Sequence, residues 1–89
     1  MDEARFPMLR IAKDTMAMGG VAPAVFNAAN ELAVAAFLES RIPFLAIPRV
    51  VEQTVGAIKN FEPADLSDVI AVDAESRRVV SARIKHLTL

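Results

Sequence analysis

The stretch from Pro23 to Ser40 constrains the fold of this chain more than any other, because it has the pattern of one helix with almost no polar face. A helix that is apolar nearly all the way round is normally enclosed by other elements. We therefore expect it to form the centre of the domain. Its apolar residues would cover two adjoining sides, with Phe26, Ala29, Ala33, Ala36 and Phe37 on one and Val25, Ala28, Leu32 and Ala35 on the other.

Proline, glycine and the spacing of apolar residues divide the rest of the chain into three further helices. Apolar residues recur at helical spacing from Pro7 to Met18, and Gly19-Gly20 then supplies the left-handed backbone that commonly ends a helix. Ser67 is a favourable N-cap for the last helix. The pattern predicts one all-α domain over residues 1–89, a small four-helix bundle with helices at about 7–18, 23–40, 48–59 and 67–87.

The connectors carry expectations of their own. Residues 42–48 are apolar but hold two prolines, which forbid a continuous helix, so we expect this segment to lie against the bundle. Asn60 is expected to end the third helix, and Phe61 and Leu66 are expected to anchor the linker that follows. Gly56 lies inside the third helix at a cost of about 1 kcal/mol relative to alanine, which indicates a close approach by a neighbouring group.

Composition excludes several classes of protein. The 89 residues have a net charge of −1, which gives no basic surplus for nucleic acid, and the absence of cysteine excludes disulfides and thiolate metal sites. The longest unbroken apolar run, 32–38, is far shorter than the roughly 20 residues needed to cross a bilayer. Residues 1–5 do not resemble a signal peptide. We expect a soluble, intracellular protein that binds neither nucleic acid nor membrane.

The polar residues of the central helix form the sharpest candidate site. Asn27, Asn30 and Glu31 are three and four residues apart and would share one face. They could be polar groups at a substrate or metal site, or a hydrogen-bonding patch that ties loops or a neighbouring domain to the helix. The sequence shows no nucleophile–base pair, metal cluster or cofactor loop, so we expect no catalytic, cofactor-binding or metal-binding residues and favour the second interpretation.

Three other features have structural explanations. His86 would interact favourably with the negative end of the last helix. Asp73 and Glu75 have the Asp-x-Glu spacing of some metal sites, but residues two apart on a helix point about 200° away from each other and cannot grip one ion. Asp73 is better placed to pair with Arg77, and the helix could bend there. Gly19-Gly20 lacks the Gly-Lys-Ser/Thr of a phosphate loop.

Four runs of the sequence carry a family resemblance: 6–12 (Phe-Pro-Met-Leu-Arg-Ile-Ala), 23–38, 41–52 and 68–77. Together they resemble the C-terminal domain of 1-deoxy-D-xylulose 5-phosphate reductoisomerase. The most specific part is Asn-Ala-Ala-Asn-Glu at 27–31, within an alanine-rich helix. The resemblance covers nearly the whole chain from Phe6 onward.

The resemblance implies a larger enzyme that rearranges 1-deoxy-D-xylulose 5-phosphate and reduces it with NADPH to 2-C-methyl-D-erythritol 4-phosphate, in the non-mevalonate route to isoprenoids. A divalent ion, magnesium or manganese, assists. The nucleotide-binding and catalytic domains of the family have no counterpart here, so none of their functional residues does either, and Asp73-Ala74-Glu75 falls in the wrong domain for the family's metal site. The chain would be inert alone, and its parent would act in the bacterial cytoplasm or in a plastid.

The resemblance also gives the polar patch a role. Asn27, Asn30 and Glu31 are expected to face the catalytic domain of the parent enzyme, or to hold the connectors beside that contact. Without its neighbour the domain would leave an apolar face uncovered, so we expect self-association, for example as a dimer with exchanged helices. The alternative is a free-standing helical interaction module that binds a partner through the same face.

Overall fold

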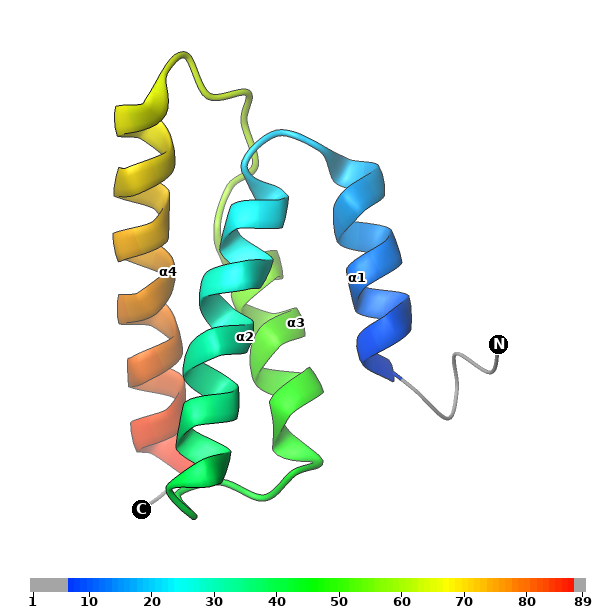
Figure 1. Cartoon of the computed structure of the whole chain (residues 1–89), viewed down its shortest axis with the longest axis vertical. Helices are drawn as coiled ribbons and strands as arrows, with labels where there is room; N and C mark the ends of the chain where they lie inside the picture. The colour runs from blue at the N-terminus through cyan, green and yellow to red at the C-terminus, as the bar shows by residue number, and fades with distance from the viewer. Residues whose placement is uncertain (1–6, 88–89) are drawn as a thin grey trace.

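The structure, a computed structural model, describes residues 7–87, which form four α-helices and no strand. The helices are α1 (Pro7–Met18), α2 (Ala22–Leu38), α3 (Ala46–Ala57) and α4 (Leu66–Leu87). They alternate in direction along the chain, and the α1–α2 and α3–α4 connections lie at the same end of the molecule (Figure 1). The expected all-α architecture is confirmed, and α1 has the predicted bounds.

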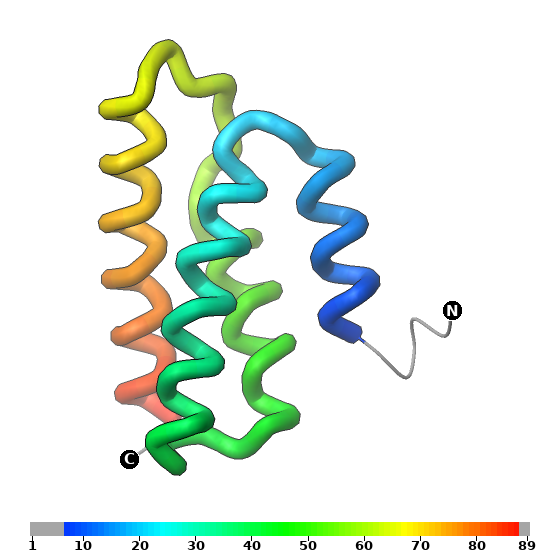
Figure 2. Tube along the Cα trace, viewed as in Figure 1, coloured from blue at the N-terminus to red at the C-terminus, as the bar shows by residue number. Residues whose placement is uncertain are grey.

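The four helices form a slab rather than a square bundle. The Cα atoms span 37 × 32 × 18 Å, and the shortest dimension accommodates about two layers of helix, since one helix with its side chains is about 10–12 Å across. Within residues 7–87, α2 contacts each of the other helices, whereas α1 and α4 do not touch (Figure 2). The prediction that this helix is central is confirmed. None of the helices described is both long and apolar enough to span a membrane.

Small residues on α2 allow this arrangement. Ala29, Ala33 and Ala36 are completely buried, so α3 and α4 approach the α2 backbone closely. A second, smaller cluster joins Val21, Val25 and Val72 near the N-terminal end of α2. The larger core cluster is completed by branched residues from the other elements, Ile11, Ile42, Ile47, Val50, Val51, Val80 and Ile84. Phe37, expected on the enclosed side of α2, is 36% exposed.

The C-terminal end of α2 lies at Leu38, two residues before the predicted end. Ser40 has a positive φ of 60° and donates its backbone N–H to the carbonyl of Phe37, while the N–H of Arg41 bonds the carbonyl of Ala36, both at 2.9 Å. This is the Schellman arrangement that satisfies the last carbonyls of a helix. Serine takes the place usually held by glycine, which is why the sequence did not show this boundary.

Helix α3 begins and ends two residues earlier than predicted. Pro48 is its third residue, where the missing N–H costs nothing because first-turn amides have no partner within the helix. The turn into α3 is made by the N–H groups of Ala46 and Ile47, which bond carbonyls in the preceding connector at 3.0 and 3.1 Å. At the other end Ile58 is extended, with φ −101° and ψ 123°, and packs against the second core cluster.

Helix α4 is capped by Asp65, and the prediction that Ser67 is the N-cap is wrong. One carboxylate oxygen of Asp65 accepts from the hydroxyl of Ser67 at 2.6 Å and from the N–H of Asp68 at 3.3 Å. Asp68 in turn accepts from the N–H of Ala64 at 2.8 Å. The helix then runs unbroken through Asp73, where the sequence allowed a bend.

Asn60 joins the two connections at one end of the slab. Its side-chain oxygen accepts from the N–H groups of Val21 and Ala22, both at 3.0 Å, and its amide donates to the carbonyl of Met18 at 3.3 Å. The predicted role of Asn60 as a helix stop is therefore wrong, since α3 ends at Ala57. The expected anchors of this linker are also wrong, because Phe61 is 40% and Leu66 is 71% exposed.

Two smaller expectations differ from the structure. Gly56 has no atom within 4 Å of the position that a Cβ would occupy, so the expected close approach is absent among residues 7–87. The 42–48 connector is only partly pressed against the bundle: Ile42 and Ile47 are buried, but Phe44 and Leu45 are not. On α4, Val72, Ser76 and Val80 are buried and face the bundle, whereas Leu87 is exposed.

Candidate functional site

Two members of the predicted polar patch belong to a surface network between α2 and α4. The amide of Asn27 donates to Glu31 at 3.1 Å, and Arg77 donates to the same Glu31 oxygen at 3.3 Å and to Asp73 at 2.8 Å. The hydrogen bond and charge of Asp73, aided by Glu31, raise the pKa of Arg77. The charged side chains are 37–55% exposed, so water screens these pairs and they contribute little to stability.

Asn30 lies apart from this network. It is one position before Glu31 and therefore about 100° away from it around the helix. Its side chain is partly buried and makes no hydrogen bond with the described residues. The three residues that spacing placed on one face thus divide into a bonded pair, Asn27 and Glu31, and an amide with unused donors and acceptor.

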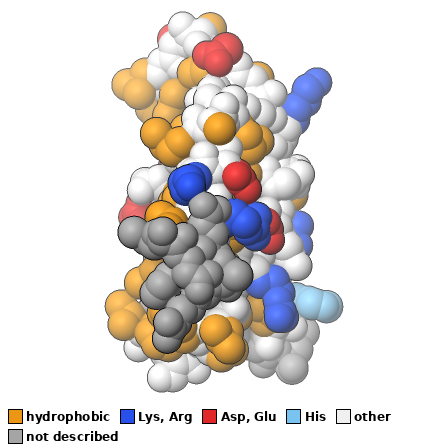
Figure 3. All heavy atoms as spheres, turned by 90° about the vertical axis from the view of Figure 1, so that its right-hand side faces the viewer, with side chains coloured by type: hydrophobic (Ala, Val, Ile, Leu, Met, Phe, Trp, Pro, Cys, Tyr) orange, Lys and Arg blue, Asp and Glu red, His pale blue; other side chains and the backbone are white. Residues whose placement is uncertain are grey.

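Asn30 opens onto a groove of about 410 Å³, which we call the Asn30 groove. None of the lining side chains from residues 7–87 is charged. It is bounded by Pro7 and Met8 from the start of α1, by Asn30 and Val34 from α2, by Phe44 and Leu45 from the connector, and by the first turn of α3. Figure 3 views the molecule from the α1 side, and hydrophobic side chains gather toward both ends of that face.

The rim of the Asn30 groove is unusually apolar for a surface. Of the residues that line the groove, Phe44 is 64% and Leu45 79% exposed; Leu38, one turn after Val34 on α2, is 74% exposed. The ring of Phe44 meets that of Phe37 edge-on, with centroids 5.4 Å apart, so the rim has a defined shape. Contiguous exposed apolar surface on a small domain marks a site of contact with another protein surface. The sequence analysis expected this connector to lie against the bundle.

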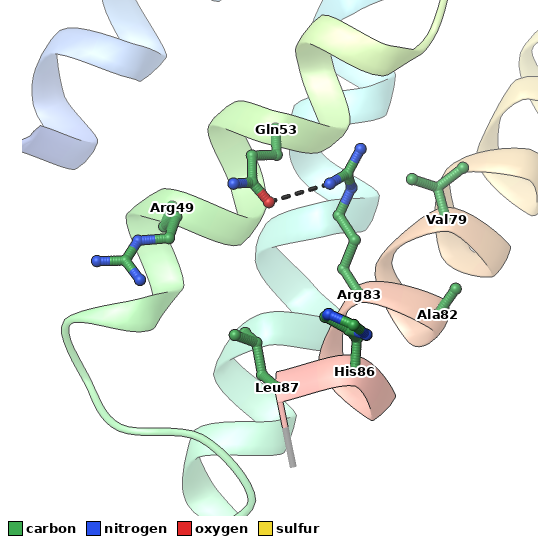
Figure 4. A pocket seen from close by; sticks show the side chains of 7 residues that line it. All are labelled: Arg49, Gln53, Val79, Ala82, Arg83, His86 and Leu87. Atoms are coloured by element: carbon green, nitrogen blue, oxygen red, sulfur yellow. Dashed lines mark hydrogen bonds between the residues drawn. The ribbon is translucent and has the colours of Figure 1, made fainter. Parts of the chain in front are cut away.

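A second hollow, of about 610 Å³, lies between α3 and α4 (Figure 4). Arg83 donates to the side-chain oxygen of Gln53 at 3.0 Å, and its buried Nε has no partner among residues 7–87. The guanidinium of Arg49 points away from that of Arg83, so the cations that line this hollow do not converge on one position (Figure 4). His86 lies exposed in the last turn of α4, at the position expected to favour a cation.

The described residues do not assemble a catalytic or metal centre. Between residues 7 and 87, no three His, Cys, Asp or Glu side chains lie close enough to hold an ion. Asp73 is paired with Arg77 and Glu75 with Arg78, so these carboxylates serve different partners. The buried hydroxyls, Thr15, Thr54 and Ser76, each donate to the carbonyl four residues earlier in the same helix.

This geometry defines a class: a small all-α domain with exposed apolar side chains beside one groove. The chain belongs to the DXP reductoisomerase C-terminal domain family, whose model matches residues 1–79.

Similar proteins agree with this assignment. The chain is 51% identical to the 1-deoxy-D-xylulose 5-phosphate reductoisomerase of Rhodospirillum centenum over 93% of its own length, and 52% identical to that of Burkholderia multivorans over 90%. It also resembles the solved structure of the reductoisomerase from Zymomonas mobilis in complex with NADPH, with a TM-score of 0.88 and 46% identity over 93% of this chain. It spans only 20–22% of the length of these three relatives.

Proposed function

We propose that this chain is the C-terminal structural domain of an NADPH-dependent reductoisomerase that converts 1-deoxy-D-xylulose 5-phosphate to 2-C-methyl-D-erythritol 4-phosphate, in the non-mevalonate route to isoprenoids. The observation that carries the proposal is the likeness to the Zymomonas mobilis reductoisomerase, a TM-score of 0.88 at 46% identity over nearly the whole chain. The parent enzyme would act in the bacterial cytoplasm or in a plastid.

In this proposal the chain supplies a rigid support and the rest of the enzyme supplies the chemistry. NADPH is bound by the Zymomonas mobilis relative, of which this chain matches about a fifth. The residues described here do not fit a divalent-metal site, so we assign no metal ligand and derive no step of the reaction on this chain. Its contribution is to fix the position of the catalytic domain that packs against it, and the chain alone has no activity.

A chimera tests the proposal. In the Zymomonas mobilis reductoisomerase the matched C-terminal region is replaced by this chain, and NADPH oxidation is followed with 1-deoxy-D-xylulose 5-phosphate and Mg²⁺. We expect turnover within about tenfold of the natural enzyme, that is, within about 1.4 kcal/mol of its activation free energy. The enzyme without its C-terminal region and this chain alone serve as controls, and both should be inactive.

A folded chimera without turnover would overturn the proposal, and so would NADPH oxidation by this chain alone. In the first case the chain would be better described as a free-standing interaction module.

A further inference from the structure

We propose that the Asn30 groove is the surface through which this domain docks onto the rest of the reductoisomerase polypeptide. An apolar segment of the preceding domains would lie between Met8, Val34 and Leu45, and the amide of Asn30 would bond its backbone. The inference rests on the proposed function and adds which face of the domain makes the contact and what kind of segment fills it.

The exposed residues of the connector point to an apolar occupant. The segment between α2 and α3 buries Ile42 and Ile47 but leaves Phe44 and Leu45 mostly in water. Among residues 7–87, every side chain that lines the groove is apolar except Asn30, and none is charged. These residues offer a charged partner no counter-ion, whereas an apolar segment would remove the exposed rings and methyl groups from water.

Asn30 gives the groove a polar point of attachment. Its amide offers two donors and one acceptor, and none of them is used within residues 7–87. Asn27 and Glu31, by contrast, are bonded to each other, and Glu31 also to Arg77. One unpaired amide in an otherwise apolar groove suits the N–H or carbonyl of an extended segment, which presents both along its edge.

The course of the chain indicates where that segment comes from. The matched family region is a C-terminal domain, and it covers only 22% of the Zymomonas mobilis chain, so nearly all of the remaining polypeptide precedes it. Pro7 and Met8, at the start of α1, form one wall of the groove. A polypeptide that leads into α1 therefore arrives beside the groove, which makes the preceding domains a better-placed occupant than a second copy.

Hydrogen–deuterium exchange in the active chimera tests the inference. Peptides that cover 42–48 should exchange at least about tenfold more slowly in the chimera than in this chain alone, equivalent to about 1.4 kcal/mol of added protection. Peptides from the hollow between α3 and α4, around Arg83, serve as the internal control and should change little.

Matched variants separate docking from folding. Leu45→Asp and Leu66→Asp each place a charge at an exposed leucine, at opposite ends of the slab. Both should leave the helical circular dichroism of the isolated chain unchanged, but only Leu45→Asp should abolish the added protection of 42–48 in the chimera.

Each result has one meaning. An active chimera in which 42–48 stays unprotected would overturn the inference and leave the proposed function intact. Protection of 42–48 in the chimera that is lost on dilution would also overturn it, because the occupant would then be a second copy rather than the same polypeptide. An inactive, folded chimera would instead count against the proposed function.

Discussion

Gly20 illustrates how one residue can fix a distant contact. It has a φ of +59°, and the connector that follows α3 packs directly onto it: a Cβ there would lie 2.6 Å from the carbonyl oxygen of Phe61 and 2.7 Å from the side-chain oxygen of Asn60. Gly19, its neighbour, has a similar φ of +65° but open space around it. The two glycines share a backbone requirement and differ in their surroundings.

That difference yields a prediction. Gly19→Ala should destabilise the domain by about 1–2 kcal/mol, the cost of a left-handed conformation with a side chain. Gly20→Ala should cost about 1–3 kcal/mol more, because the added methyl group must displace backbone. Urea unfolding of the two variants measures both values. Equal losses would show that the connector does not approach Gly20 as the structure has it.

At the scale of a helix, the start of α4 gives a pH dependence. The hydroxyl of Ser67, followed by the N–H of Asp68, bonds the carboxylate of Asp65 and lowers its pKa. A carboxylate whose pKa is lowered on folding adds stability above its unfolded value of about 3.9, and that stability is lost as the pH falls through the lower, folded value.

We therefore expect Asp65→Ala to be less stable than the natural chain at neutral pH and to approach it in stability as the pH is lowered toward 2. Chemical denaturation at a series of pH values would show the two curves converging. Glu62→Ala, a nearby change at an exposed carboxylate, is the control and should not alter the pH dependence. Parallel curves for Asp65→Ala and the natural chain would contradict the assigned cap.

The alanines of α2 give a second prediction at this scale. Ala33 is completely buried in the main core cluster, so Ala33→Leu has no space to fill and should destabilise the domain by about 1–3 kcal/mol. Ala74→Leu, at an exposed position of α4, should change stability by less than about 0.5 kcal/mol. Thermal unfolding of both variants measures the difference. A neutral Ala33→Leu would mean that α2 is less tightly enclosed.

The same elements show what the sequence could and could not predict. The number of helices, the bounds of α1 and the central place of α2 follow from apolar spacing, which is a local property. The ends of the other helices depended on choices that spacing does not make: Asp65 and Ser67 are both good caps two residues apart, and Ser40 takes a conformation that usually indicates glycine. These boundaries differ from prediction by one or two residues.

The candidate site was harder to predict because its contacts are distant in sequence. The side chain of Asn60 accepts a hydrogen bond from the backbone of Val21, 39 positions away, and no local sequence pattern predicts that contact. Spacing placed Asn27, Asn30 and Glu31 on one face, but only the position of Arg77 on α4 shows that Glu31 is engaged while Asn30 is not. The apolar connector at 42–48 was expected to lie against the bundle, since hydrophobicity alone does not distinguish a segment that packs on the core from one that stays exposed.

At the scale of the whole molecule, the exposed apolar side chains of the Asn30 groove predict concentration-dependent association. The isolated chain exposes Phe44 and Leu45 in the lining of this groove, and a second copy could cover them. We expect light scattering to show dimers or larger species as the concentration rises. Leu45→Asp should shift the chain toward monomer, whereas Leu66→Asp should not. A monomer at all concentrations would remove this expectation, although it would leave the docking proposal standing.

The bonds of Asn60 have a further consequence for how the slab can deform. They fasten the α1–α2 turn to the linker after α3 at one end of the molecule, while the Asn30 groove lies toward the other end, beside the start of α1 (Figure 1). An outward swing of α1 would leave those bonds in place, but it would have to break the ion pair between Arg10 and Glu52, 2.8 Å apart, and expose the buried side chains of Ile11 and Thr15. The groove can therefore widen only if an inserted segment makes contacts that offset these losses.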